Sequence, residues 1–328
     1  MTATLPEEVQ RVFDRFITTE YTAFDATGLP ITWPVTPYYS PGGTTIDVTT
    51  GVGYPKKAND ARANPKVALL FSEPHGSGIE GPPMVLVQGT AEVDDADLQA
   101  NMERYGREAP LKLPGVKNLL PPKPVQRTMG WYFKRLYVKV RPERVYVWPD
   151  GDIAAEPTLL DTRLEEVRSA HVEEPESAEP GSAGGEGVWD ERMDQLGDRY
   201  DSAVLSVMAP DGFPFSLRVP VVADRAGRRV GIPADPVGAP LRPGRACLTA
   251  HDHGEQFEWQ RNFQVRGELV EDGDGWALIP RKLVGGFELP PGSERITANV
   301  RKMFRYRRIG KREIALIRKE RDRTSGGP

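Results

Sequence analysis

Residues 45–65 combine lysines, threonines and glycines where a predicted strand runs into a short helix closed by Pro65. The residues of this segment that can serve a ligand are Thr49, Thr50, Gly51, Gly53, Tyr54, Lys56, Lys57 and Asn59. Glycine lets a backbone approach a ligand closely, and a helix start offers free N–H groups to an anion. Lys56 and Lys57 add positive charge. The segment is interpreted as an anion cradle, although by spacing alone a surface helix with lysines in water fits equally well.

Other reactive residues form no recognisable constellation. His251 and His253 alternate with Asp252, so both can lie on one side of a strand, but no third metal ligand stands nearby. The single cysteine, Cys247, excludes an intrachain disulfide and lies in an apolar run typical of a buried thiol. A Gly-x-Ser-x-Gly elbow is absent. No metal site is predicted and no catalytic residue is assigned.

The elements that position the cradle occur twice. The Gly28–Pro30 turn of the first half corresponds to Gly212 and Pro214 in the second. Further pairs are residues 67–71 with 246–250, and residues 84–89 with 262–267. Each half opens with a predicted amphipathic helix (6–16 and 189–199) and closes with a predicted pair of strands (131–147 and 304–317). This order predicts a mainly β protein made of two small barrels in tandem, with short flanking helices.

Length and composition agree with two domains, since 328 residues exceed the usual size of one. We predict a first barrel over 1–155, a linker over 156–188, a second barrel over 189–318 and a disordered tail over 319–328. Within the linker, residues 159–171 are expected to form a helix and residues 172–187 to be disordered.

Charge and hydropathy bound the possible partners. The net charge of −4 offers no general attraction to nucleic acid or anionic lipid. The basic residues of 301–312 are interpreted as a solvated strand face or as partners of acidic groups, rather than as a nucleic-acid site. No signal peptide or membrane span is recognised, so a cytoplasmic location is expected.

Several short motifs carry a family resemblance. They are the Gly28–Pro30 turn, the run Pro34, Val35, Thr36 and Pro37, the run Thr49, Thr50 and Gly51, the group Lys57, Asn59, Asp60, Asn64 and Pro65, and the strand 87–92. In order and spacing, residues 6–148 resemble the flavin-binding split barrel of the pyridoxamine 5'-phosphate oxidase superfamily, in particular its flavin and deazaflavin oxidoreductase branch. The second half resembles the same barrel more faintly.

The resemblance implies a cofactor, flavin mononucleotide (FMN) or alternatively a deazaflavin coenzyme. Lys57 would bind its phosphate, Thr49 and Thr50 would line phosphate and ring, and residues 34–36 would lie along the isoalloxazine. The implied function is an oxidoreductase that transfers hydride to or from a small-molecule substrate. The alternative is a non-catalytic protein that binds or carries flavin, deazaflavin or haem. One departure is Asn59 and Asp60, where the family often has arginine and asparagine.

The second half departs further. Its counterpart of the cradle contains Pro233, Pro236, Pro240 and Pro243, which lack the backbone donors that a phosphate needs. This second cradle is predicted not to bind phosphate. Because barrels of this family pair, the tandem chain is expected to form an internal pseudo-dimer, as a monomer or within a homodimer. The second barrel would then form part of the wall of the first site, and Trp259 and Arg261 are candidate residues of that wall.

Overall fold

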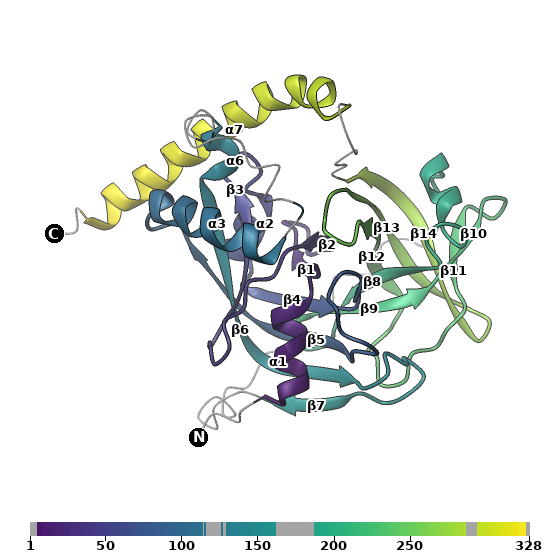
Figure 1. The fold of residues 1–328 in the computed structure, drawn as a ribbon. Coiled ribbons are helices and arrows are strands. Elements are labelled where there is room, and N and C mark those ends of the chain that lie inside the picture. Colours follow the sequence, from purple (N-terminus) through teal and green to yellow (C-terminus); the bar gives the residue numbers. More distant parts are fainter. Residues whose placement is uncertain are drawn as a thin grey trace.

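The chain forms two seven-stranded antiparallel sheets, one from each half of the sequence (Figure 1). The computed structural model describes residues 5–113, 115, 126, 129–161, 187–286 and 294–325. The first half contains α1 (Glu7–Arg15), β1 (Thr19–Phe24), β2 (Pro30–Val35), β3 (Ile46–Gly51), α2 (Lys56–Ala63), β4 (Lys66–Phe71), β5 (Met84–Asp94), α3 (Leu98–Lys112), α6 (Gly130–Phe133), β6 (Arg135–Trp148) and β7 (Thr158–Asp161). The second contains the 3-10 helix η2 (Glu191–Gln195), β8 (Ser202–Met208), β9 (Pro214–Pro220), β10 (Val222–Asp224), β11 (Arg229–Ile232), β12 (Gly244–His253), β13 (Gln260–Asp272) and β14 (Gly275–Gly285), followed by α7 (Glu294–Ser325).

The two sheets have the same strand order. The first runs β2-β1-β4-β5-β6-β3, and the second runs β9-β8-β12-β13-β14-β11 before β10 extends it. Both long hairpins carry a bulge at one place, where Gly89 faces Pro142 and Gly267 faces Pro280. A Cβ on either glycine would lie 2.1 Å from a carbonyl oxygen of the partner strand, so only glycine fits. The predicted internal repeat and the mainly β class are confirmed.

The halves are joined through their sheets rather than only through a linker. One core fills the first half, and the other contains second-half residues together with five from the first: Ala68, Leu70, Met84, Leu86 and Trp148. Between the sheets, four buried hydroxyls form a closed cluster, with Thr22 bonded to Thr32 and Ser216, and Ser206 bonded to Thr32 and Ser216. Thr22 and Thr32 face each other on β1 and β2, as Ser206 and Ser216 do on β8 and β9. The cluster therefore relates equivalent positions of the two halves, as a pseudo-dimer requires.

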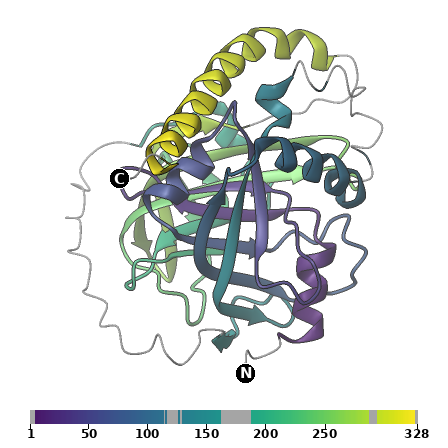
Figure 2. The same ribbon diagram turned by 90° about the vertical axis from the view of Figure 1, so that its left-hand side faces the viewer.

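The C-terminal segment is a helix, which corrects the predicted strand pair over residues 304–317. In Figures 1 and 2, α7 runs along the outside of the first half, close to α3 and α6. Its inward side presents Tyr306, Gly310, Glu313 and Ile317, whose spacing of three and four residues is helical. The predicted strand pair rested on the correspondence with residues 131–147, whereas these four residues follow a helical period. The predicted fraying of 319–328 is also wrong up to Ser325.

Three smaller expectations also change. Residues 131–147 form α6 and the single long strand β6 instead of a strand pair. Residues 189–199 hold only the five-residue η2, which Asp190 caps at its start by accepting from the Arg192 amide, and which ends where Leu196 turns extended and Gly197 adopts a left-handed φ of +92°. The segment 159–171, predicted to be a helix, begins instead as the strand β7, which pairs with β6. Residues 162–186 lie outside the described residues, and they include most of the linker that was predicted to be disordered. Within the described parts of the chain, every helix is too short or too polar to cross a bilayer.

Candidate functional site

The cradle forms where β3 ends and α2 begins, as the sequence predicts. Gly51 pairs with Arg135 at the first position of β6, so the loop lies beside that arginine. The two glycines, however, make room for protein. A Cβ on Gly53 would lie 2.9 Å from the Trp131 carbonyl oxygen and 3.2 Å from Tyr306, and one on Gly51 would lie 3.0 Å from the same Trp131 oxygen. The close approach expected of a ligand is therefore made here by α6 and α7.

The cradle contains two cations, Lys57 and Arg135, and neither pairs with a carboxylate among the described residues. Lys57 is partly buried, with its Nζ 5.7 Å from the ring centre of Trp33, and Arg135 is only 6% exposed. Among the described residues, neither side chain forms an ion pair or a hydrogen bond, and the Nε of Arg135 is a buried donor without an acceptor. Burial, together with the nearby Arg135 charge, lowers the pKa of Lys57 to about 8. Two buried like charges cost free energy unless an anion joins them.

Tyrosines surround Arg135. Its guanidinium lies 3.9 Å from the ring centre of Tyr105 and 4.4 Å from that of Tyr132, and Tyr54 and Tyr38 lie close enough to interact with its charge. Burial lowers the pKa of Arg135, but these tyrosines more than offset it, so the net pKa is above its ordinary value. Cation–π contacts of this kind stabilise a desolvated cation by about 2 kcal/mol. The arginine therefore stays charged, and its charge is available to an anionic ligand.

The threonines and Tyr54 are engaged within the loop. The Thr50 hydroxyl donates to the Tyr54 carbonyl oxygen at 2.8 Å, and the Thr49 hydroxyl donates to the Leu136 carbonyl oxygen at 3.1 Å. The Tyr54 ring packs edge-on against Tyr306 at 4.9 Å. These residues shape the cradle, but the hydroxyl protons of Thr49 and Thr50 are committed to other acceptors.

Lys56 differs from its neighbour. Its Nζ pairs with Asp60 at 2.8 Å, so its charge is already compensated. Burial raises the pKa of Asp60, and the hydrogen bond from Lys56 opposes that rise. Asn59 is exposed and accepts a hydrogen bond from Arg62. Of the two lysines that the sequence singled out, only Lys57 remains unpaired.

The strand expected to flank a ring is β2 with Thr36 just beyond it. Pro34 and Val35 are buried, Thr36 is partly exposed, and Trp33 stacks on Tyr21 at 6.2 Å. The second half reaches this strand, because Gln264 and Thr249 both donate to the Thr32 carbonyl oxygen. Sequence reasoning missed Trp33, Arg135 and Gln264, since their place is set by pairing between distant segments.

Trp259 and Arg261 are not brought to the cradle by any contact among the described residues. Arg261 lies 5.6 Å from the ring centre of Trp259, and its charge acts on Tyr200. His251 and His253 do lie on one side of β12 and are buried, as predicted. His251 Nε2 lies 2.7 Å from Glu20 and 2.9 Å from Arg218, so it belongs to a charge cluster between the halves. No group of three or more metal-ligating side chains occurs within the described ranges.

The counterpart of the cradle in the second half is a loop without a helix, as its prolines predict. A hollow of about 340 Å³ beside it is lined in part by Ile232, Pro233, Trp276, Asp272 and Asp274. Carboxylates at this hollow repel a phosphate, whereas the first cradle holds two unpaired cations. The asymmetry between the halves is therefore electrostatic as well as conformational.

No protein-family profile and no curated protein matches the sequence. Similar solved structures include a protein from Listeria innocua named as a pyridoxamine 5'-phosphate oxidase, 15% identical over 43% of this chain and 95% of its own, with a TM-score of 0.31. General stress protein 26 from Bacillus anthracis is 16% identical over 47% of this chain and 96% of its own, with a TM-score of 0.32. A protein named F420 reductase is 17% identical over 43% of this chain and 98% of its own, with a TM-score of 0.34. At these identities the likeness concerns the fold, and no residue role transfers from it.

Proposed function

We propose that this protein binds one FMN or deazaflavin coenzyme per chain and acts as an oxidoreductase on a small molecule. The observation that carries the proposal is the pair formed by the partly buried Lys57 and the buried Arg135. Neither cation pairs with a carboxylate among the described residues, and Lys57 lies beside the indole of Trp33. A phosphate joined to an aromatic ring system complements this arrangement. The neighbours named for pyridoxamine 5'-phosphate oxidase and F420 reductase agree with this choice of ligand.

The residues present fit the phosphate end of such a cofactor. Lys57 and Arg135 would bind the phosphate, because the Nε of Arg135 is a buried donor that has no hydrogen-bond acceptor among the described residues. The strand from Trp33 to Thr36 would flank the ring, and the bound ring would supply the hydride chemistry. Thr50 would orient the loop through its bond to Tyr54 and would not donate to the phosphate. The protein thus contributes binding, orientation and charge, as cofactor enzymes do.

A stoichiometry of one follows from the second half, where a proline-rich loop and carboxylates replace the cradle. An internal pseudo-dimer follows from the hydroxyl cluster and the shared core, and a single chain therefore holds both barrels that a site needs. We propose a cytoplasmic protein whose partner is a small-molecule substrate.

The test is a titration of the purified protein with FMN and, separately, with a deazaflavin coenzyme, followed by calorimetry and by absorbance. The expected result is saturation near one equivalent by one of the two. Turnover of reduced nicotinamide nucleotides and electron acceptors then distinguishes an enzyme from a carrier, which would show only stoichiometric reduction. Absence of binding by both compounds would refute the proposed site, and two equivalents would refute the asymmetry of the halves.

A further inference from the structure

The exposed side of α7 is predominantly basic. Residues 304–323 contain nine lysines and arginines against three carboxylates, a net charge of +6, in a chain whose net charge is −4. The cations on the solvent side are Arg305, Arg307, Arg308, Lys311, Arg312, Arg318, Lys319 and Arg323. We call this set the basic face of α7. It lies opposite the buried Gly310, Glu313 and Ile317, as a rotation of 100° per residue requires.

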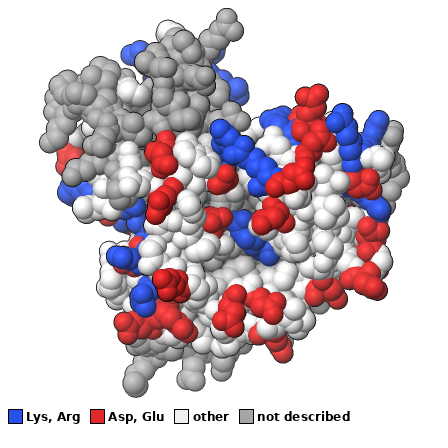
Figure 3. All heavy atoms as spheres, turned by 45° about the vertical axis from the view of Figure 1, so that its right-hand side comes forward, with Lys and Arg blue, Asp and Glu red and all other residues white. Residues whose placement is uncertain are grey.

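The cations of the basic face have no ion-pair partner within the part of the chain that the structure describes. Among the described residues, none of its eight cations forms an ion pair, while Glu313 pairs with Arg62 on the inner side of the helix. The face of the molecule in Figure 3 differs, because lysines and arginines there lie among aspartates and glutamates. The charge is therefore segregated onto one straight element, where eight like charges repel one another unless a partner compensates them.

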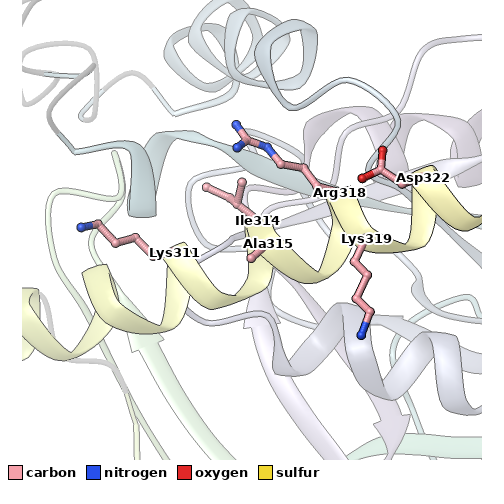
Figure 4. Close-up of a pocket in the computed structure, with 6 residues that line it drawn as sticks. All are labelled: Lys311, Ile314, Ala315, Arg318, Lys319 and Asp322. Carbon is pink, nitrogen blue, oxygen red and sulfur yellow. The ribbon is translucent and has the colours of Figure 1, made fainter.

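The geometry of the basic face matches a linear polyanion. From Arg305 to Arg323 the helix extends about 27 Å at 1.5 Å per residue, and duplex nucleic acid carries about one charge per 1.7 Å of its axis. A hollow of about 420 Å³ opens along the helix, and its charged lining consists of three cations, Lys311, Arg318 and Lys319, and one carboxylate, Asp322. In Figure 4 these side chains extend from the helix around Ile314 and Ala315. Extended cations beside small and aliphatic residues leave room for a phosphate backbone to lie against the helix.

We propose that the basic face of α7 binds the phosphate backbone of double-stranded nucleic acid without reading its sequence. A membrane surface is less well matched, because the only large apolar side chains exposed on this stretch are Phe304 and Leu316, which are three turns apart. A second copy of this chain is also less well matched, because a folded acidic surface would need many carboxylates arranged in a line. The sequence-based expectation of no nucleic-acid binding rested on the net charge of −4 and on the lack of a recognised binding motif, whereas this proposal rests on the local charge of one helix.

The test compares two variants that remove the same number of charges. The first is R308Q/K311Q/R312Q/K319Q on the basic face, and the control is R11Q/R141Q/R242Q/K282Q, at exposed cations elsewhere. Binding to a fluorescent 20-base-pair duplex is measured by anisotropy from 50 to 300 mM salt, using the full chain. Circular dichroism and the thermal midpoint establish that both variants fold.

The wild type is expected to bind with a dissociation constant of about 10⁻⁶–10⁻⁴ M, and the affinity should fall steeply with salt. The basic-face variant should bind at least about tenfold more weakly at 50 mM salt, with a salt slope smaller by up to about 3.6, since each of the four phosphate contacts contributes about 0.9. The control should retain most of the affinity. Equal losses in both variants, or no binding by the wild type, would overturn the proposal. Binding only to phosphatidylserine vesicles would reassign the face to lipid, and salt-sensitive dimerisation without duplex binding would reassign it to a second copy.

Discussion

Replacing Lys57 with methionine should make the ligand-free protein more stable and its cofactor binding weaker. Methionine keeps a chain of similar length but removes an ammonium that is buried near Arg135 without a carboxylate. Lowering the pKa of Lys57 from 10.5 to about 8 corresponds to a cost of up to about 3 kcal/mol for the charged form at pH 7. The free energy of unfolding should therefore rise by up to that amount at neutral pH.

The pH dependence of the free energy of unfolding tests independently whether the charge on Lys57 destabilises the native protein. Below pH 8 both the native and the unfolded chain carry the Lys57 proton, so the full cost of the buried charge is present. Between pH 8 and 10.5 the unfolded chain binds more protons at this lysine than the native one, so wild-type stability gains a contribution that grows with pH. The Lys57→Met variant lacks that contribution. Its advantage over the wild type should shrink across this window and vanish above it.

Cofactor binding should respond in the opposite direction. A charged hydrogen bond to phosphate contributes about 1.5–3 kcal/mol, so the variant should bind FMN or deazaflavin roughly 10- to 150-fold more weakly. The assays are urea unfolding at pH 7 and at pH 10, and calorimetric titration with the cofactor.

The control is Lys56→Met. Lys56 is half exposed and pairs with Asp60, so its loss leaves a partly buried carboxylate without its cation and should lower stability. A Lys57→Met protein that is less stable at pH 7, or a stability difference that does not change with pH, would contradict the assignment of Lys57 as an uncompensated buried charge.

Three further results are expected. Glu20→Gln removes the carboxylate that accepts from Arg218 at 3.0 Å and contacts His251 at 2.7 Å, so urea unfolding should show a loss of about 3–5 kcal/mol in stability. Burial raises the pKa of Glu20, but His251 and Arg218 lower it below the ordinary value overall. The stabilisation by Glu20 should therefore be present at neutral pH and fade as pH falls below about 4.5. Gly267→Ala should prevent normal folding, because its Cβ would lie 2.1 Å from the Ile279 oxygen, whereas Gly106→Ala, in open space on α3, should raise the thermal midpoint by adding about 0.5–1 kcal/mol. Cys247 is fully buried and burial raises the pKa of its thiol, so a thiol reagent should label it no faster than the protein unfolds; rapid labelling of native protein would contradict this placement.

The repeat was predictable because its signals are local. Gly28 and Gly212 both adopt left-handed φ angles of about +75° at the same hairpin turn, and glycine is what that conformation favours. The strands between the turns are apolar runs of similar length. The position of the cradle followed in the same way, since its residues are consecutive in sequence.

The composition of the site was less predictable because it depends on distant pairing. Arg135 lies in the cradle because the register of β6 on β3 places it opposite Gly51. Trp33 lies on β2 and contacts Lys57 on α2. The Glu20 cluster joins residues 198 and 231 positions apart. The prediction of the C-terminal helix failed for a different reason. Its buried positions are few, and the arginines between them obscured the helical period.

The two halves show which parts of a duplicated barrel are constrained by packing and which by a ligand. Gly89 with Pro142, and Gly267 with Pro280, are the same solution to one steric problem, since a side chain at either glycine would collide with the partner strand. The halves also differ in the region after β3 and β11. Packing against Trp131 and Tyr306 accounts for the glycines of the first loop, but it does not account for the cations beside them. The first half keeps a helix, a lysine and an arginine, at a cost in stability that packing does not explain. A costly pair of charges at a place where the two halves diverge is the strongest argument that the first cradle serves an anion.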